Sequence, residues 1–143
     1  MLQEDESADV TIIGVGAELG LAIDVAAQLR SGPLNLRVRV VSFPSHRLFE
    51  KQSLEYRRKT LRRGTGTPAI VIEPYAALGW ERYADAAVCM STDRFGQSLP
   101  GPKAYEYFGF SADTITQKVV GYLERRRVGE ILPGEFVEMT RNA

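Results

Sequence analysis

Residues 10–29 read VTIIGVGAELGLAIDVAAQL. An apolar run at residues 10–13 is followed by a turn that contains Gly14 and Gly16, and then by apolar residues spaced as on one helix face. The residues of that face are Leu19, Ala22, Ile23, Ala26 and Leu29. This pattern predicts a buried strand, a tight turn and a helix that packs back onto a sheet, which is how an α/β unit begins.

The rest of the chain continues the alternation of strands and helices. Further strands are expected at residues 36–43, 69–72 and 86–90, and Ser45, Ser53 and Ser111 are placed to cap helices. The pattern predicts a largely parallel sheet covered on both faces. In the second strand Arg37 and Arg39 alternate with apolar residues, so one face is expected to be partly wet near its start. The predicted core contains Ile12, Ile13, Leu19, Ile23, Val38, Val40, Ile70, Val71, Val88, Ile115 and Val119.

Composition narrows the class of protein. A chain of 143 residues forms one ordinary domain, and 18 basic against 18 acidic residues argue against an electrostatic grip on nucleic acid or on acidic membranes. Cys89 is the only cysteine, which excludes a disulfide framework within the chain and a cysteine metal cluster. Residues 1–9 are polar and no apolar run approaches the roughly 20 residues of a spanning helix. We therefore expect an intracellular protein, cytoplasmic in the first place, with the peroxisome left open.

The glycine turn invites a comparison with dinucleotide sites. Gly14, Gly16 and Gly20 are one residue off the usual spacing, and no acidic residue ends the second strand. Glu18 also lies at the helix start, where it would repel a phosphate. A structural turn is favoured over a dinucleotide site.

Other candidate residues follow strand ends, where ligands bind in open α/β sheets. Ser45 and His46 follow the second strand, but His46 has no titratable partner at a telling spacing, so polar surface is favoured over catalysis. Asp93 and Arg94 follow the fourth strand, and a pair that fixes the loop is favoured over an anion site. A solvated helix face is the favoured interpretation of the basic residues Arg57, Arg58, Lys59, Arg62 and Arg63.

Four stretches together resemble one known family. They are TIIGVGAELGLAIDVA (11–26), VRVVSFPSHRLFEKQ (38–52), AIVIEP (69–74) and STDRFGQSLPGPKAYEYFGFS (91–111). In this order they resemble the C-terminal domain of transketolases and dihydroxyacetone synthases. The later stretch GEILPGEFVEM (129–139) looks closer to the dihydroxyacetone synthases.

The resemblance implies a three-layer α/β/α sandwich with a mostly parallel five-stranded sheet. Its first strand would be an antiparallel edge strand, clipped here to residues 1–3. The domain is expected over residues 1–126, with a C-terminal tail over 127–143. In the family, thiamine diphosphate and magnesium are held by two other domains, so no catalytic, cofactor-binding or metal residue can be transferred to this sequence.

Three functions follow as expectations. The first is a non-catalytic C-terminal domain that supports the dimer of a transketolase-like enzyme and has a regulatory ligand role left open. The second is a stand-alone module that binds a small anion through Gly16, Ser45–His46 and Asp93–Arg94. The third is a protein-interaction module. The expected partners are a second copy or the missing cofactor-binding domains, with no nucleic acid and no membrane.

Overall fold

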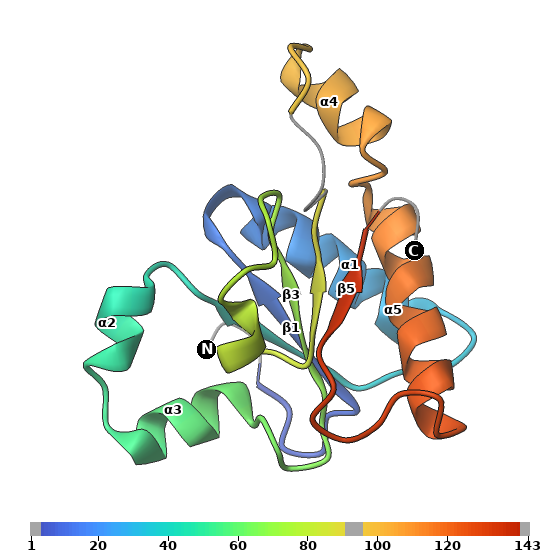
Figure 1. Cartoon of the computed structure of the whole chain (residues 1–143). Coiled ribbons are helices and arrows are strands. Elements are labelled where there is room, and N and C mark those ends of the chain that lie inside the picture. The colour runs from blue at the N-terminus through green and yellow to red at the C-terminus, as the bar shows by residue number, and fades with distance from the viewer. Residues whose placement is uncertain (1–3, 91–95, 141–143) are drawn as a thin grey trace.

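The computed structural model describes residues 4–90 and 96–140. Five strands form one sheet in the order β2-β1-β3-β4-β5, and every neighbouring pair is parallel (Figure 1). The strands are β1 (Val10–Gly14), β2 (Val38–Ser42), β3 (Ala69–Ile72), β4 (Ala86–Val88) and β5 (Val137–Met139). In register, Ile12 of β1 lies beside Val40 of β2 and Ile70 of β3. All three are buried, as an apolar strand covered on both faces requires.

Helices cover the two faces of the sheet and make three layers. On one face, α1 (Leu19–Ser31) and α5 (Ala112–Arg127) pack over Ile12, Val40 and Ile70. On the other, α3 (Leu54–Leu61) and the 3-10 turn η2 (Trp80–Arg82) pack over Ile13 and Val71. The expected three-layer architecture is therefore confirmed. All of the predicted core is buried except Leu19 and Ile23, which are partly buried against it.

The predicted serine caps are present at three helix starts. Ser45 Oγ accepts from the Leu48 amide at 3.3 Å and begins α2 (His46–Glu50), while Ser53 begins α3 in the same way. Ser111 Oγ accepts from the Thr114 amide at 3.3 Å at the start of α5. Each cap supplies a partner to an amide that has none within its helix.

Two glycines in the turn between β1 and α1 are required by its geometry. A Cβ on Gly14 would lie 2.8 Å from the Leu19 Cα and 2.9 Å from the Ala22 Cβ, so only glycine allows α1 to approach this closely. Gly16 opens the short turn η1 (Gly16–Glu18) with a φ of +56°, a left-handed conformation that favours glycine. A Cβ added at Gly20 would meet no atom of the surrounding structure within 4 Å, so Gly20 is not required by packing. Gly14 and Gly16 therefore serve the turn and the packing of α1, in line with the predicted structural turn.

The sheet edge differs from the expectation. The predicted antiparallel strand is not among the described strands, and residues 1–3 lie outside the described part of the chain. The fifth strand is instead β5, from residues expected to form a tail, and it runs parallel to β4 because α5 returns the chain across the sheet before β5 begins. The Val137 amide donates to the Asp85 carbonyl at 3.1 Å, and Lys118 Nζ donates to the Thr140 carbonyl at 2.7 Å.

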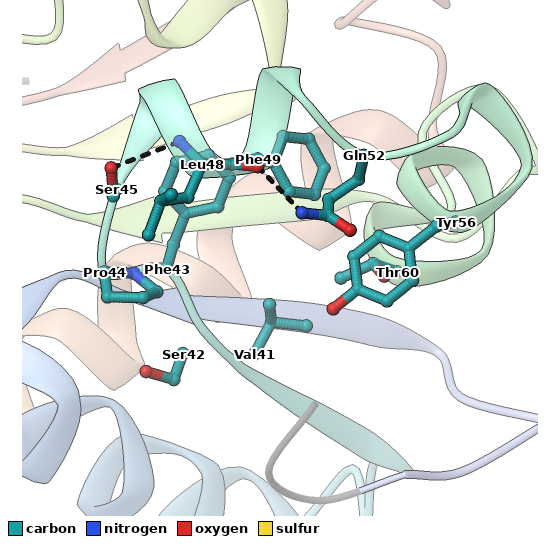
Figure 2. Close-up of a pocket in the computed structure, with 10 residues that line it drawn as sticks. All are labelled: Val41, Ser42, Phe43, Pro44, Ser45, Leu48, Phe49, Gln52, Tyr56 and Thr60. Carbon is teal, nitrogen blue, oxygen red and sulfur yellow. Dashed lines mark hydrogen bonds between the residues drawn. The ribbon is translucent and has the colours of Figure 1, made fainter.

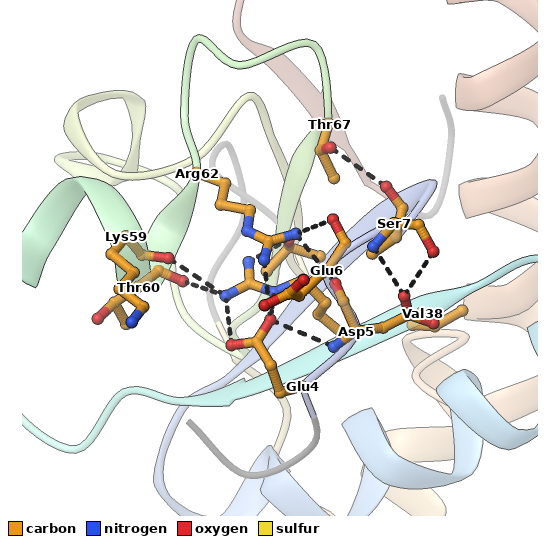
Figure 3. A network of polar contacts seen from close by, with 12 residues as sticks. Glu4, Asp5, Glu6, Ser7, Val38, Lys59, Thr60, Arg62 and Thr67 are labelled. Atoms are coloured by element: carbon orange, nitrogen blue, oxygen red, sulfur yellow. Dashed lines mark hydrogen bonds and ion pairs between the residues drawn. The ribbon is translucent and has the colours of Figure 1, made fainter.

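The prediction that the start of the second strand is partly exposed to solvent is right for Arg37 and wrong for Arg39. The Arg37 side chain is 55% exposed and pairs with Asp9 at 2.7 Å. Arg39 is fully buried, and its Nε donates to Glu4 Oε1 at 2.7 Å within the polar network of Figure 3. Arg62 reaches the same Glu4 oxygen at 3.1 Å. The segment before β1 therefore lies over Arg39 and keeps water from it.

Candidate functional site

A groove of about 950 Å³ opens at the carboxyl edge of the sheet. The β1–α1 turn contributes Gly16 and Glu18, and the residues after β3 contribute Glu73 and Tyr75. The far wall includes Tyr105 of α4 (Gly101–Tyr107), the helix that projects beyond the sheet at the top of Figure 1. The carboxyl ends of adjacent parallel strands are a usual place for a ligand or partner in such folds.

Glu18 and Tyr105 join the two sides of this groove. The Tyr105 hydroxyl donates a hydrogen bond to Glu18 Oε1, although the two residues are 87 positions apart. Only 6% of Glu18 is exposed. The hydrogen bond to the carboxylate, helped by burial, raises the pKa of Tyr105 to about 12. Tyr105 therefore remains protonated at neutral pH and holds α4 against the β1–α1 turn.

Glu73 is a second buried carboxyl group in the groove. It is 8% exposed, and its Oε1 accepts from the Tyr75 amide at 3.2 Å. Burial raises the pKa of Glu73, and the negative charge of Glu18 raises it further. No lysine, arginine or histidine is among the described residues that line the groove. Two acidic groups therefore lie among the described residues of one groove, and the charge of His46 partly offsets the rise in the pKa of Glu73.

Ser45 and His46 lie apart from this groove. Ser45 is used as the α2 cap, beside a pocket of about 230 Å³ between the end of β2 and helices α2 and α3 (Figure 2). The His46 ring packs 4.6 Å from the Trp80 ring and 5.1 Å from that of Phe43, between centroids. His46 is exposed and its ring packs against aromatic side chains, which favours the predicted surface role.

The sequence-based site is thus brought together only in part. Gly16 and Glu18 do lie in one groove, whereas Ser45 and His46 do not line it. Asp93 and Arg94 lie outside the described residues. The sequence interpretation missed Glu73, whose position directly after a strand is the same signal that singled out Ser45–His46 and Asp93–Arg94.

Metal and thiol chemistry find little support in the described residues. Within residues 4–90 and 96–140, no three His, Cys, Asp or Glu side chains are grouped so that they could hold a metal ion. Cys89 is buried, and burial raises its pKa to about 11, so the thiol stays protonated and unreactive at neutral pH. In the described part of the chain, no helix combines the length and apolar character needed to span a membrane.

Known proteins match nearly all of this chain. The transketolase-like TK C-terminal domain family matches residues 1–111. Dihydroxyacetone synthase of Candida boidinii is 45% identical over 140 residues, which are 98% of this chain and 19% of that protein. The Pichia angusta enzyme is 42% identical over 97% of this chain and 19% of its own length.

Solved structures agree in fold. A transketolase from Leishmania mexicana superposes with a TM-score of 0.75 at 32% identity, covering 86% of this chain and 17% of that one. A transketolase from Pichia stipitis gives 0.79 at 27% identity, covering 88% of this chain and 18% of that one. The chain thus spans about one fifth of the length of these relatives.

Proposed function

Because this chain belongs to the transketolase C-terminal domain family, we propose that it acts within a ketol-transferring enzyme as the domain that supports assembly and not the chemistry. The observation that carries the proposal is the 45% identity to a dihydroxyacetone synthase along 98% of this chain but 19% of that enzyme. The similarity at this level favours dihydroxyacetone synthase over transketolase as the type of parent enzyme.

The proposal places thiamine diphosphate and its magnesium ion in other domains. Magnesium prefers near-octahedral oxygen ligands, and the described residues offer no group of three acidic side chains for it. The groove does not fit a diphosphate either, because Glu18 and Glu73 would add negative charge beside the phosphate oxygens. The acidic character of the groove therefore supports the assignment of the cofactor and its chemistry to other domains.

Self-association is part of the proposal. Tyr75 and Leu78 lie three positions apart in the chain after β3 and are 79% and 88% exposed, and large apolar side chains left exposed favour association. We expect a homodimer and an intracellular location. We also expect residues 1–3, before β1, to supply an antiparallel edge strand. The boundary after residue 126 also stays a prediction. Light scattering that finds only monomer at high micromolar concentration would contradict the dimer.

The cofactor assignment has a direct test. Titration calorimetry of the purified chain with thiamine diphosphate and magnesium should show no micromolar binding, and the chain should not cleave xylulose 5-phosphate. Micromolar binding that depends on magnesium, or cleavage by the chain alone, would overturn the proposed function.

A second candidate is a stand-alone protein-interaction module. The exposure of Tyr75 and Leu78 favours it, since neither side chain contributes to the core. The anion-binding alternative is weaker, because the carboxyl-edge groove that contains Gly16 is acidic and Ser45 is used as a helix cap. Binding of inorganic phosphate by the isolated chain at micromolar concentration would restore the anion-binding alternative.

A further inference from the structure

A pocket of about 160 Å³, which we call the arginine pocket, lies between α2, α3 and η2 and is separate from the carboxyl-edge groove. Its described lining includes four arginines and one acidic residue, which are Arg57, Arg58, Arg63, Arg82 and Glu50. These five side chains carry a net charge of +3 at neutral pH, because four positive charges face one negative charge. The sequence predicts a solvated helix face for the first three arginines, and only the fold brings Arg82 of η2 to them. Positive charge gathered in a concave site attracts anions.

Glu50 holds two of these arginines side by side. Its Oε2 accepts from Arg57 Nη1 at 2.7 Å and from Arg82 Nη2 at 3.1 Å, while its Oε1 accepts from the Tyr83 hydroxyl at 2.7 Å. The hydrogen bond from Tyr83 and the two positive charges lower the pKa of Glu50, so this group stays ionised at neutral pH. A guanidinium has five N–H donors, so one bond to Glu50 leaves most of them for another acceptor. Two guanidinium groups that share one oxygen are therefore placed to bind a second anion together.

The size and charge of the arginine pocket define the kind of anion that fits. Its volume is below the roughly 300–1,000 Å³ of sites for drug-sized ligands, so it suits one small group. Arginine donors pair with carboxylates and phosphates, and a doubly charged phosphate gains more than a singly charged carboxylate from a net charge of +3. Glu55 and Glu81 are close in sequence, but both are exposed and neither lines the pocket. Leu54, 52% exposed, adds an apolar wall for the rest of the molecule.

We propose that the arginine pocket binds the phosphate group of a small molecule, with Arg57 and Arg82 as paired donors. Arg58 and Arg63 are exposed and add positive charge to the same pocket. The site is different from the anion-binding alternative discussed above, which uses the loops at the strand ends. It also goes beyond the proposed function and does not depend on it, because all of these residues belong to this chain.

The test is an NMR titration of the nitrogen-15-labelled chain at neutral pH and constant ionic strength. Inorganic phosphate and glycerol 3-phosphate are the probes, and acetate is the singly charged comparison. The variant is Arg63→Gln/Arg82→Gln, which changes two exposed side chains and should therefore leave the fold intact. The matched control, Arg125→Gln/Arg127→Gln, removes the same charge from exposed positions of α5, on the opposite face of the sheet.

The expected result is saturable binding that depends on the pocket. Both phosphate probes should shift the amide signals of Arg57, Arg82 and Tyr83, with a dissociation constant of about 1 mM. Acetate should bind at least about tenfold more weakly. The pocket variant should weaken phosphate binding at least about tenfold, because it removes charge-assisted contacts, and the control should weaken it less than about twofold.

Several results would overturn the proposal. An equal loss in the control variant would show only a general attraction of anions to positive charge, and shifts confined to the strand-end loops would place the anion there. Binding of inorganic phosphate without glycerol 3-phosphate would exclude a phosphorylated molecule. If neither probe binds, the phosphate site is wrong, and a polyglutamate peptide that shifts the same signals would identify an acidic protein segment as the occupant. None of these results changes the proposed function.

Discussion

Arg39→Met should be among the most damaging single substitutions in this domain. The buried guanidinium donates to Glu4, to Thr11 Oγ1 at 3.0 Å and to the Thr60 carbonyl at 3.1 Å. The Thr60 carbonyl lies in the last turn of α3, where it has no partner within the helix, so Arg39 also caps that helix. One residue therefore ties the segment before β1, the sheet and α3 together.

The cost can be built from the groups that would be left behind. Methionine fills the stem of the arginine but donates nothing, so the Thr11 hydroxyl and the Thr60 carbonyl lose their donor at about 1–3 kcal/mol each. Glu4 loses less, because 41% of its side chain is exposed and water can replace part of the pairing. A total of about 3 kcal/mol follows, which for a chain of 143 residues lowers the melting temperature by roughly 10 °C.

Arg37→Met is the matched control. Arg37 is two residues away on the same segment, but its side chain is 55% exposed, so its pair with Asp9 should matter little. Urea unfolding followed by circular dichroism would give both free energies of unfolding. Equal losses for the two variants, or a stable Arg39→Met, would refute the reasoning.

The pH dependence provides a second check on the same network. The hydrogen bond from Arg39 lowers the pKa of Glu4 below its ordinary value of 4.5. Stability from this pair is therefore present above about pH 4.5 and is lost as the pH falls through the lower pKa of the folded state. The difference in the free energy of unfolding between wild type and Arg39→Met should narrow as the pH falls below about 4.5. A difference that stays constant below that pH would show that the ion pair is not its source.

Three further predictions concern the turn, the sheet and the groove. Gly14→Ala should lower the free energy of unfolding by about 2 kcal/mol or more, because the new Cβ would lie 2.8 Å from a backbone carbon. Gly20→Ala, in open space on α1, should be neutral or stabilising. Thermal melts that rank the two variants the other way would contradict the turn geometry. Ile70→Asp places an unpaired charge at a position with no exposure and should abolish folding, so a soluble variant with an unchanged melting temperature would count against the fold. Glu73→Gln should raise the melting temperature at neutral pH, because the raised pKa of Glu73 means that its ionised form opposes folding; this gain should vanish below about pH 4.5, and a loss at neutral pH would show that the carboxylate is stabilising.

The parts of the fold that could be predicted are those encoded locally. The strand, turn and helix of residues 10–29 depend on spacing within 20 residues, and the serine caps depend on contacts three residues along. By contrast, β5 has only three residues, too few for any periodicity to distinguish it from a tail. Its strand character comes from pairing with β4 and not from its own sequence.

The remaining errors came from partners that are distant in sequence. The alternation in its strand predicts that Arg39 is exposed to solvent. Its burial depends on Glu4, 35 residues earlier, and no local pattern places Glu4 over the sheet. Likewise, Glu18 and Glu73 share a groove only because β1 lies beside β3. The alternation of strands and helices predicts a parallel sheet but does not fix the order of its strands.

The position of β1 at the middle of the sheet also bears on how the chain reaches its native state. Although β1 is the first described strand, both of its neighbours come later, with Thr11 aligned to Arg39 on one side and to Ala69 on the other. The segment that joins β1 to β2 is shorter than the segment that separates β1 from β3, so pairing β1 with β2 costs less loop-closure entropy. The β1–α1–β2 unit is therefore expected to nucleate folding before β3 and β4 add to it. Until β3 arrives, one edge of β1 remains unpaired, and this apolar strand is then the place where a newly made chain is most open to aggregation.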